Sequence, residues 1–175
     1  WSLSVEEQFY LVWPLLLVLA TRVRLKVGLL LGVAVVGSFL FALHLGEIRL
    51  DALYFHPLAR FWELLFGAGL AYAHHRFGVD VLPARMDRVW VRHLLSLGGL
   101  TAVCAAMLTF DGKTPHPGLH ALLPLLGAVA LIASGPVAMG NRLLAFQPIV
   151  RVGLISYPLY LWHWPVLSYL RIMES

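Results

Sequence analysis

The sequence has few charged residues and a single cysteine, and both shortages exclude classes of protein. Charged residues make up 13% of the 175 positions and hydrophobic residues 60%, and the mean hydropathy is +0.81. These values lie outside the range of soluble domains and indicate an integral membrane protein. The single cysteine, Cys104, cannot form an intrachain disulfide or a thiolate metal site, and no histidine spacing typical of a metal site is present. We therefore expect no bound metal and no bound cofactor.

The beginning of the sequence also lacks the marks of a leader. It starts at Trp1 without an initiator methionine, a basic segment or a small-residue cleavage site, so we do not expect the first apolar segment to be a signal peptide. We expect residues 1–175 to be part of one membrane domain in a longer protein. The net charge of +4 does not indicate nucleic-acid binding, because the basic residues cluster at the ends of apolar segments.

Apolar segments recur along the whole chain and predict an all-α, polytopic bundle of about six membrane helices. They cover residues 5–20, 25–43, 58–73, 94–110, 119–134 and 152–170. Nine of the 13 lysines and arginines lie in connections that an alternating topology places on one side of the membrane. The positive-inside rule makes that side cytoplasmic. The start of the chain and its C-terminus are then expected on the extracytoplasmic side.

The first segment carries two adjacent carboxylates into an apolar run. If the helix begins after Ser4, then Ser4 and Glu7 have the spacing of a capping box, which accounts for Glu7. Such a helix is about 24 Å long, shorter than the hydrocarbon core, so Glu6 is expected near the edge of the apolar layer.

Helical periodicity then places Glu6 at the head of an aromatic stripe with Tyr10, Trp13 and Leu17, flanked by Phe9. One interpretation is an interfacial aromatic belt with a carboxylate favoured by the helix N-terminus. The other is a carboxylate that lines a cavity, as polar groups at membrane depth often do.

Arg60 and Glu63 are three residues apart in the third segment and can pair within one helix. Gly67 and Ala71 continue their face and would let another helix approach closely. The pair is either purely structural or a guanidinium that its partner orients toward a carboxylate or phosphate of a substrate.

The last segment places polar side chains on one face of an apolar helix. Ser156, Tyr160 and His163 share this face, and Tyr157 lies beside Trp164. The histidine is either a satisfied structural hydrogen-bonding group or a base inside the membrane domain.

Four motifs in this order resemble the membrane acyltransferase family 3, and most nearly its O-antigen and peptidoglycan acetylases. They are residues 1–14 (WSLSVEEQFYLVWP), 59–68 (ARFWELLFGA), 120–127 (HALLPLLG) and 153–165 (GLISYPLYLWHWP). The resemblance covers nearly the whole chain.

The resemblance implies a multi-pass enzyme of the bacterial inner membrane. It would transfer an acyl group, commonly acetyl, from cytoplasmic acyl-coenzyme A to a hydroxyl of a cell-envelope carbohydrate. In the family, the best candidate for the catalytic histidine lies in an early helix, upstream of the Trp-Ser-Leu motif. We therefore expect N-terminal helices of the same protein to be needed, and residues 1–175 to be inactive alone. Part of the family carries an extracytoplasmic SGNH-like domain after the last membrane helix.

On this basis we expect a site on the extracytoplasmic side. The supporting catalytic candidates are Glu6 and His163. The substrate-binding candidates are Arg60, Glu63, Tyr157, Tyr160 and Trp162. Two other classes of function stay open from the residues alone, because both also place polar groups within a membrane: a transporter or flippase of an acyl or glycan intermediate, and a noncatalytic membrane scaffold.

Overall fold

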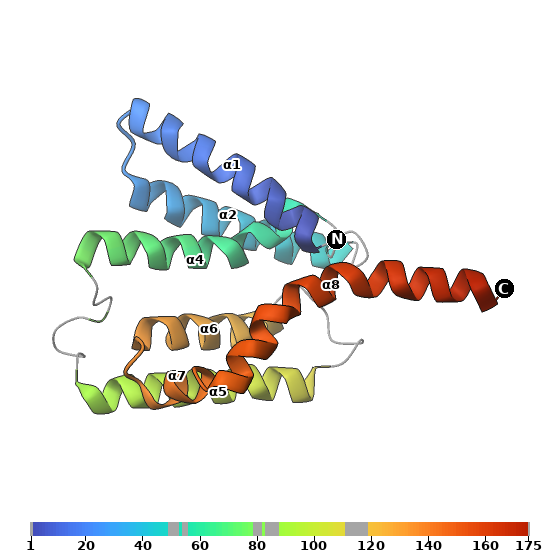
Figure 1. The fold of residues 1–175 in the computed structure, drawn as a ribbon. Helices are drawn as coiled ribbons and strands as arrows, with labels where there is room; N and C mark the ends of the chain where they lie inside the picture. The colour runs from blue at the N-terminus through green and yellow to red at the C-terminus, as the bar shows by residue number, and fades with distance from the viewer. Residues whose placement is uncertain are drawn as a thin grey trace.

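A computed structural model describes residues 2–48, 53, 56–78, 82, 88–110 and 119–174. These residues form helices joined by short connections, and no strand occurs among them, which confirms the all-α prediction (Figure 1). The elements are α1 (Ser2–Arg22), α2 (Val27–Ile48), α4 (Pro57–Phe77), α5 (Val89–Thr109), a 3-10 turn (Leu119–Ala121), α6 (Leu122–Ser134), α7 (Met139–Leu144) and α8 (Gln147–Glu174).

All six predicted apolar segments coincide with helices, and the short α7 was not predicted. Three described helices, α1, α2 and α5, are long and apolar enough to cross a membrane, and Leu119–Ser134 is a shorter apolar helix. The total of about six membrane helices is therefore not confirmed. The 21 residues of α1 correct its expected length, because they extend about 31 Å at 1.5 Å per residue.

The boundaries of α4 follow from its flanking residues. His56 is extended (φ −82°, ψ 116°) and Pro57 takes the first turn, where its missing N–H costs no hydrogen bond. The helix ends at Phe77 and is followed by Gly78, whose φ of 91° favours glycine. Arg60 and Glu63 consequently lie within the first two turns of α4.

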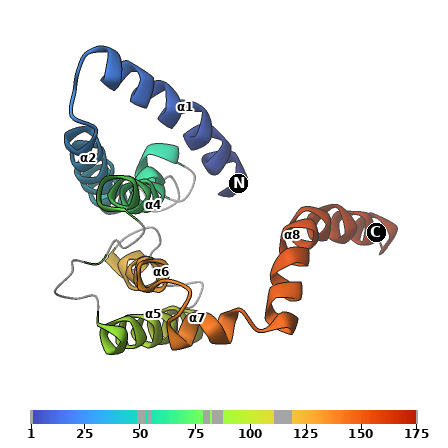
Figure 2. The same cartoon turned by 60° about the vertical axis from the view of Figure 1, so that its left-hand side comes forward.

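The described helices pack as two groups. In the first, α4 packs against α1 and α2, and in the second, α5 packs against α6 and α7, while α4 and α6 connect the groups (Figures 1 and 2). The helices α5 and α6 approach most closely at two glycines. A Cβ atom on Gly99 would lie 2.5 Å from the Gly127 carbonyl oxygen, and one on Gly127 would lie 2.8 Å from the Gly99 carbonyl oxygen. Only glycine allows this contact between backbones.

A buried polar cluster holds α7 against α5 and α6. The Asn141 side-chain amide donates to the carbonyl oxygens of Gly135 (2.7 Å) and Leu131 (2.8 Å), and the Asn141 backbone N–H donates to Ser96 Oγ at 3.0 Å. Ser96 and Ser134 are fully buried, and the Asn141 amide also donates to Ser134 Oγ at 3.2 Å. The cluster fixes α7, which precedes the turn into α8.

Helix α8 follows that turn and projects away from the other helices over its C-terminal half (Figures 1 and 2). Pro158 and Pro165 lie inside it, and each removes one helical hydrogen bond, which is the usual cause of bending such as Figure 1 shows. Ser168 is the only side chain of α8 that is even partly buried among residues 147–173.

Candidate functional site

Phe9 anchors the beginning of α1 against α4. Its buried ring stacks on Trp13, with centroids 5.9 Å apart, and meets Phe61 of α4 edge to face at 5.4 Å. Glu6 is half-buried one turn earlier, whereas Tyr10 is 65% exposed. The predicted stripe is thus rotated, because Phe9 rather than Tyr10 faces the neighbouring helix.

The predicted capping box at Ser4 and Glu7 is wrong. Helix α1 already includes Ser2, so Ser4 lies inside the first turn and cannot be the residue that precedes the helix. Its hydroxyl instead accepts a hydrogen bond from Gln8 Nε2 at 3.3 Å. Glu7 is exposed. The two adjacent carboxylates therefore differ in burial, since Glu6 is half-buried.

Arg60 and Glu63 form the predicted ion pair. Arg60 Nη2 lies 3.6 Å from Glu63 Oε2, and each side chain is 23% exposed. Partial burial reduces water screening, so the pair holds the guanidinium in place more firmly than a surface pair would. Gly67 and Ala71, expected to admit another helix on this face, are exposed among the described residues.

Tyr160 and His163 of α8 share an open cavity of about 590 Å³ with Leu3 of α1. Trp164 and Pro165 also line it, so the cavity joins the first turn of α1 to the Trp-His-Trp-Pro segment. Tyr157 and Trp162 do not line this cavity, and both are exposed, at 56% and 68%. Trp164, which the sequence places beside Tyr157 but which was not among the named substrate-binding candidates, lines the cavity, and Trp162 does not.

The hydrogen bond of His163 determines which ring nitrogen can act as a base. Its Nδ1 faces the Tyr160 carbonyl oxygen within hydrogen-bond distance. A carbonyl oxygen only accepts, so Nδ1 must carry the proton and donate it. In the neutral imidazole, Nε2 is then unprotonated and has a lone pair available. The helix itself thereby sets the tautomer that a general base requires.

The predicted residues fall into local groups rather than around one cavity. Arg60 pairs with Glu63 on α4, and Tyr160 lies beside His163 on α8. Glu6, Arg60 and Glu63 are not among the residues that line the cavity at His163. The single cavity expected to involve all four charged or titratable side chains therefore stays a prediction.

Two side chains near the start of α4 were missed by sequence reasoning. Trp62 is fully buried, and among the described residues its Nε1 and His56 Nδ1 are the buried side-chain nitrogens without a hydrogen-bond partner. A buried donor without a partner costs free energy, so these atoms are candidates for contact with a ligand. Trp62 stands between Arg60 and Glu63 in the sequence, but only the packing reveals that it is buried.

Comparison with known proteins identifies a family and several relatives that match nearly the whole chain. The model of a family described as an acyltransferase domain matches residues 1–173. The peptidoglycan O-acetyltransferase OatA of Listeria monocytogenes is 26% identical over 180 residues, covering 96% of this chain and 28% of that protein. YrhL of Bacillus subtilis, to which the same activity is provisionally ascribed, is 30% identical over 95% of this chain and 28% of its own length. The chain thus spans less than a third of these relatives, and no solved structure matches it.

Proposed function

The chain belongs to the acyltransferase family whose model covers residues 1–173, and from this premise we propose that the protein O-acylates a carbohydrate of the cell envelope. The family match is the observation that carries the proposal. It is supported by relatives named as peptidoglycan O-acetyltransferases and by apolar helices that can cross a membrane. The acyl group is acetyl, the acceptor is a carbohydrate hydroxyl, and the donor is acyl-coenzyme A.

Transfer from a thioester requires a base at the acceptor hydroxyl and a positive or donor group at the developing oxyanion. His163 offers an Nε2 lone pair beside an open cavity, and the half-buried Glu6 is a second acid or base. Arg60, oriented by Glu63, supplies fixed positive charge for an anionic group of the donor or acceptor. Tyr157, Tyr160 and Trp162 offer ring surfaces for a sugar. A histidine on an earlier helix of the same protein completes the site.

The protein resides in the bacterial inner membrane, with the start of α1 and the end of α8 on the extracytoplasmic side. This orientation rests on the basic residues. The ends of α1, α4 and α6 and the beginnings of α2 and α5 lie at one end of the molecule (Figure 1). Seven of the 13 lysines and arginines lie at or between the helix ends of the first two pairs along the chain, α1 with α2 and α4 with α5, and Arg142 and Arg151 follow α6 in α7 and α8.

Separate substitution of the neighbouring residues Glu6 and Glu7 tests the role of Glu6. Glu6→Gln in the full-length protein should abolish most O-acetylation of the envelope polymer, measured as ester-linked acetate per cell at equal membrane abundance. Glu7→Gln is the matched control, because it makes the same chemical change at an exposed neighbour and should leave acetylation near normal. Equal activity in the two variants would remove Glu6 from the site.

Arg60→Ala should likewise reduce acetylation, and Arg60→Lys should restore only part of it, because an ammonium lacks the planar fork of the guanidinium. His163→Gln should remove the base without removing the side chain's hydrogen-bonding capacity. For either residue, near-normal product at normal abundance would contradict the assigned role.

Purified protein separates the proposed enzyme from the other two classes. Given acetyl-coenzyme A and a glycan acceptor, an acyltransferase forms a new ester on the glycan. A transporter or flippase moves its cargo and forms none. A scaffold forms none and responds to these substitutions only in assembly.

A further inference from the structure

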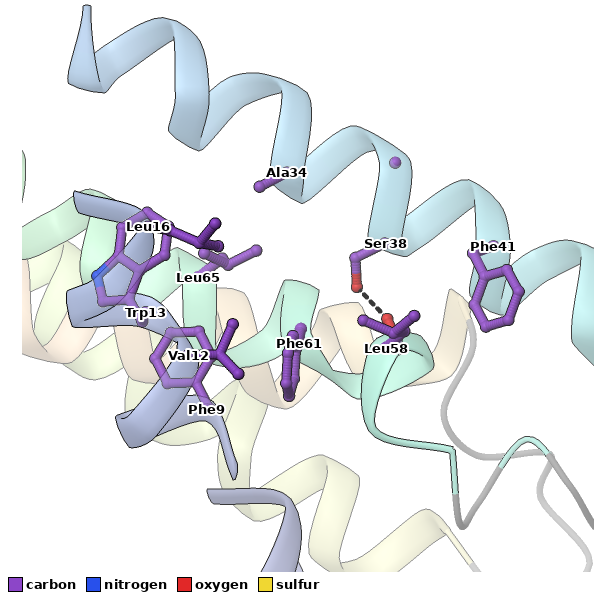
Figure 3. Close-up of a pocket in the computed structure, with 11 residues that line it drawn as sticks. Phe9, Val12, Trp13, Leu16, Ala34, Ser38, Phe41, Leu58, Phe61 and Leu65 are labelled. Carbon is purple, nitrogen blue, oxygen red and sulfur yellow. Dashed lines mark hydrogen bonds between the residues drawn. The ribbon is translucent and has the colours of Figure 1, made fainter. Parts of the chain in front are cut away.

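The cavity at His163 and the groove between α1, α2 and α4 differ in what they offer a ligand. Aromatic and aliphatic side chains line the groove, and the Ser38 hydroxyl there already donates to the Leu58 carbonyl oxygen (Figure 3). The cavity at His163 combines three kinds of ring, the imidazole of His163, the phenol of Tyr160 and the indole of Trp164. Polar groups placed among apolar surfaces are typical of sites that orient a small ligand. The cavity at His163 is therefore the better match to a carbohydrate.

The two tryptophans that flank His163 in the sequence lie on different sides of α8. Counted from Tyr160 at about 100° per residue, Trp164 is about 40° around the helix and Trp162 about 200°. His163 is about 60° from Tyr160 in the other direction. Trp164 is accordingly the middle one, in order around the helix, of the five α8 residues that line the cavity. Trp162, on the far side, does not line it.

The Trp164 ring is open to a ligand, since 62% of the residue is exposed. The face of an aromatic ring carries partial negative charge, so it attracts groups of partial positive charge. A pyranose presents such groups, its axial C–H bonds, on its faces and its hydroxyls at its rim. Stacking on an exposed indole therefore binds a sugar through its C–H face and leaves its hydroxyls free to react.

Trp164 and His163 lie at nearly the same height along α8. They are consecutive residues, so they differ by about 1.5 Å along the helix axis. The Nε2 lone pair of His163 is available, because Nδ1 donates to the Tyr160 carbonyl oxygen. Building on the acyl transfer proposed above, we propose that the acceptor sugar stacks on Trp164, which places one of its hydroxyls at His163 Nε2. Trp164 is then a further specificity-determining residue of that reaction.

Leucine separates this role from that of an interfacial anchor. Tryptophans near the ends of membrane helices often only anchor the helix at the interface, and an anchor does not depend on the side of the helix. Leucine is apolar and large but has no flat ring, so Trp164→Leu keeps contact with lipid and removes stacking. Trp164→Phe keeps a ring. Trp90→Leu is the matched control, because Trp90 of α5 is 57% exposed and does not line the cavity.

The test is steady-state acetylation by the full-length protein in a mild detergent, with acetyl-coenzyme A as donor and an oligomer of N-acetylglucosamine as the glycan. Trp164→Leu should raise KM for the glycan about ten-fold, the scale of one lost ring contact, and leave KM for acetyl-coenzyme A unchanged. Trp164→Phe should recover most of the loss, Trp162→Leu should raise KM by less, and Trp90→Leu should not change it. Calorimetric titration of the glycan without the donor should show the same order in Kd.

These two measurements separate the inference from the function on which it rests. If the glycan binds through Trp164 and no ester forms, the acyl-transfer proposal fails and the binding site stands. If esters form while Trp164→Leu and Trp90→Leu have equal KM and Kd for the glycan, the acyl-transfer proposal stands and this inference is wrong. It is also wrong if Trp162→Leu and Trp164→Leu weaken binding equally, or if the unsubstituted protein does not bind the glycan. Should Trp164→Leu fail to fold, Trp164→Met, also apolar and without a ring, carries the same expectation.

Discussion

The neighbouring glycines Gly98 and Gly99 should respond oppositely to the same substitution. Alanine at either position removes the conformational cost of glycine in a helix, which is worth about 1 kcal/mol. At Gly98 nothing opposes this gain, because the added Cβ meets no atom within 4 Å. At Gly99 the Cβ would lie 2.5 Å from the Gly127 carbonyl oxygen and 3.1 Å from the Leu131 nitrogen. Both contacts are with backbone, so α5 and α6 must separate.

The size of the difference follows from overpacking. Forcing extra carbon into a well-packed contact costs about 1–3 kcal/mol. Gly98→Ala should therefore be more stable than the unsubstituted protein by up to about 1 kcal/mol, and Gly99→Ala less stable than Gly98→Ala by about 1–3 kcal/mol. For a domain of this size that difference corresponds to about 2–12 °C in melting temperature.

Thermal unfolding in a mild detergent measures this difference, with the fraction that stays monodisperse after heating as the readout. Gly127→Ala is a second arm of the test, because its Cβ would lie 2.8 Å from the Gly99 carbonyl oxygen and should destabilise in the same way. If Gly99→Ala melts at or above Gly98→Ala, then α5 and α6 do not meet through these glycines. The packing of α5 against α6 would then need revision.

Two further substitutions test the packing around the site. Asn141→Ala removes the donors to two partly buried carbonyl oxygens and should cost about 2–4 kcal/mol. The loss is measured as a lower melting temperature and as loss of acetylation, and unchanged stability would contradict the role of this cluster. Trp62→Ala should cost about 3–5 kcal/mol by leaving a large void, whereas Trp62→Phe should cost much less, because it also removes an indole N–H that has no partner. Equal membrane abundance of the two Trp62 variants would refute that difference.

Contacts within one helix were predictable from the sequence. Residues three apart lie on one face of any helix, whatever packs against it. The pairing of Arg60 with Glu63 and the adjacency of Tyr160 and His163 needed no more than this rule. The approximate positions of the six long helices were also predictable, because each follows from the apolar run of its own segment.

Contacts between helices were not predictable, because periodicity leaves the rotation of each helix undetermined. The stripe led by Glu6 and Tyr10 and the stripe through Phe9 differ by less than half a turn, and both are aromatic. Only the contact between Phe9 and Phe61 selects the second. The incorrect capping box has a related cause, since its spacing fits a helix that begins after Ser4, and α1 includes Ser2.

The position of His163 depends on contacts that no single segment encodes. Among residues 147–173, α8 has one partly buried side chain, and the α7 turn connects it to the second group of helices. Asn141 holds α7 on α5 and α6, and those two helices meet through Gly99 and Gly127. A substitution that disrupts either of these contacts would displace His163 but leave its tautomer unchanged, because the hydrogen bond to the Tyr160 carbonyl oxygen lies within α8. The tautomer that the proposed role of His163 needs is thus set within α8, whereas the place of His163 beside the first turn of α1 depends on contacts between helices.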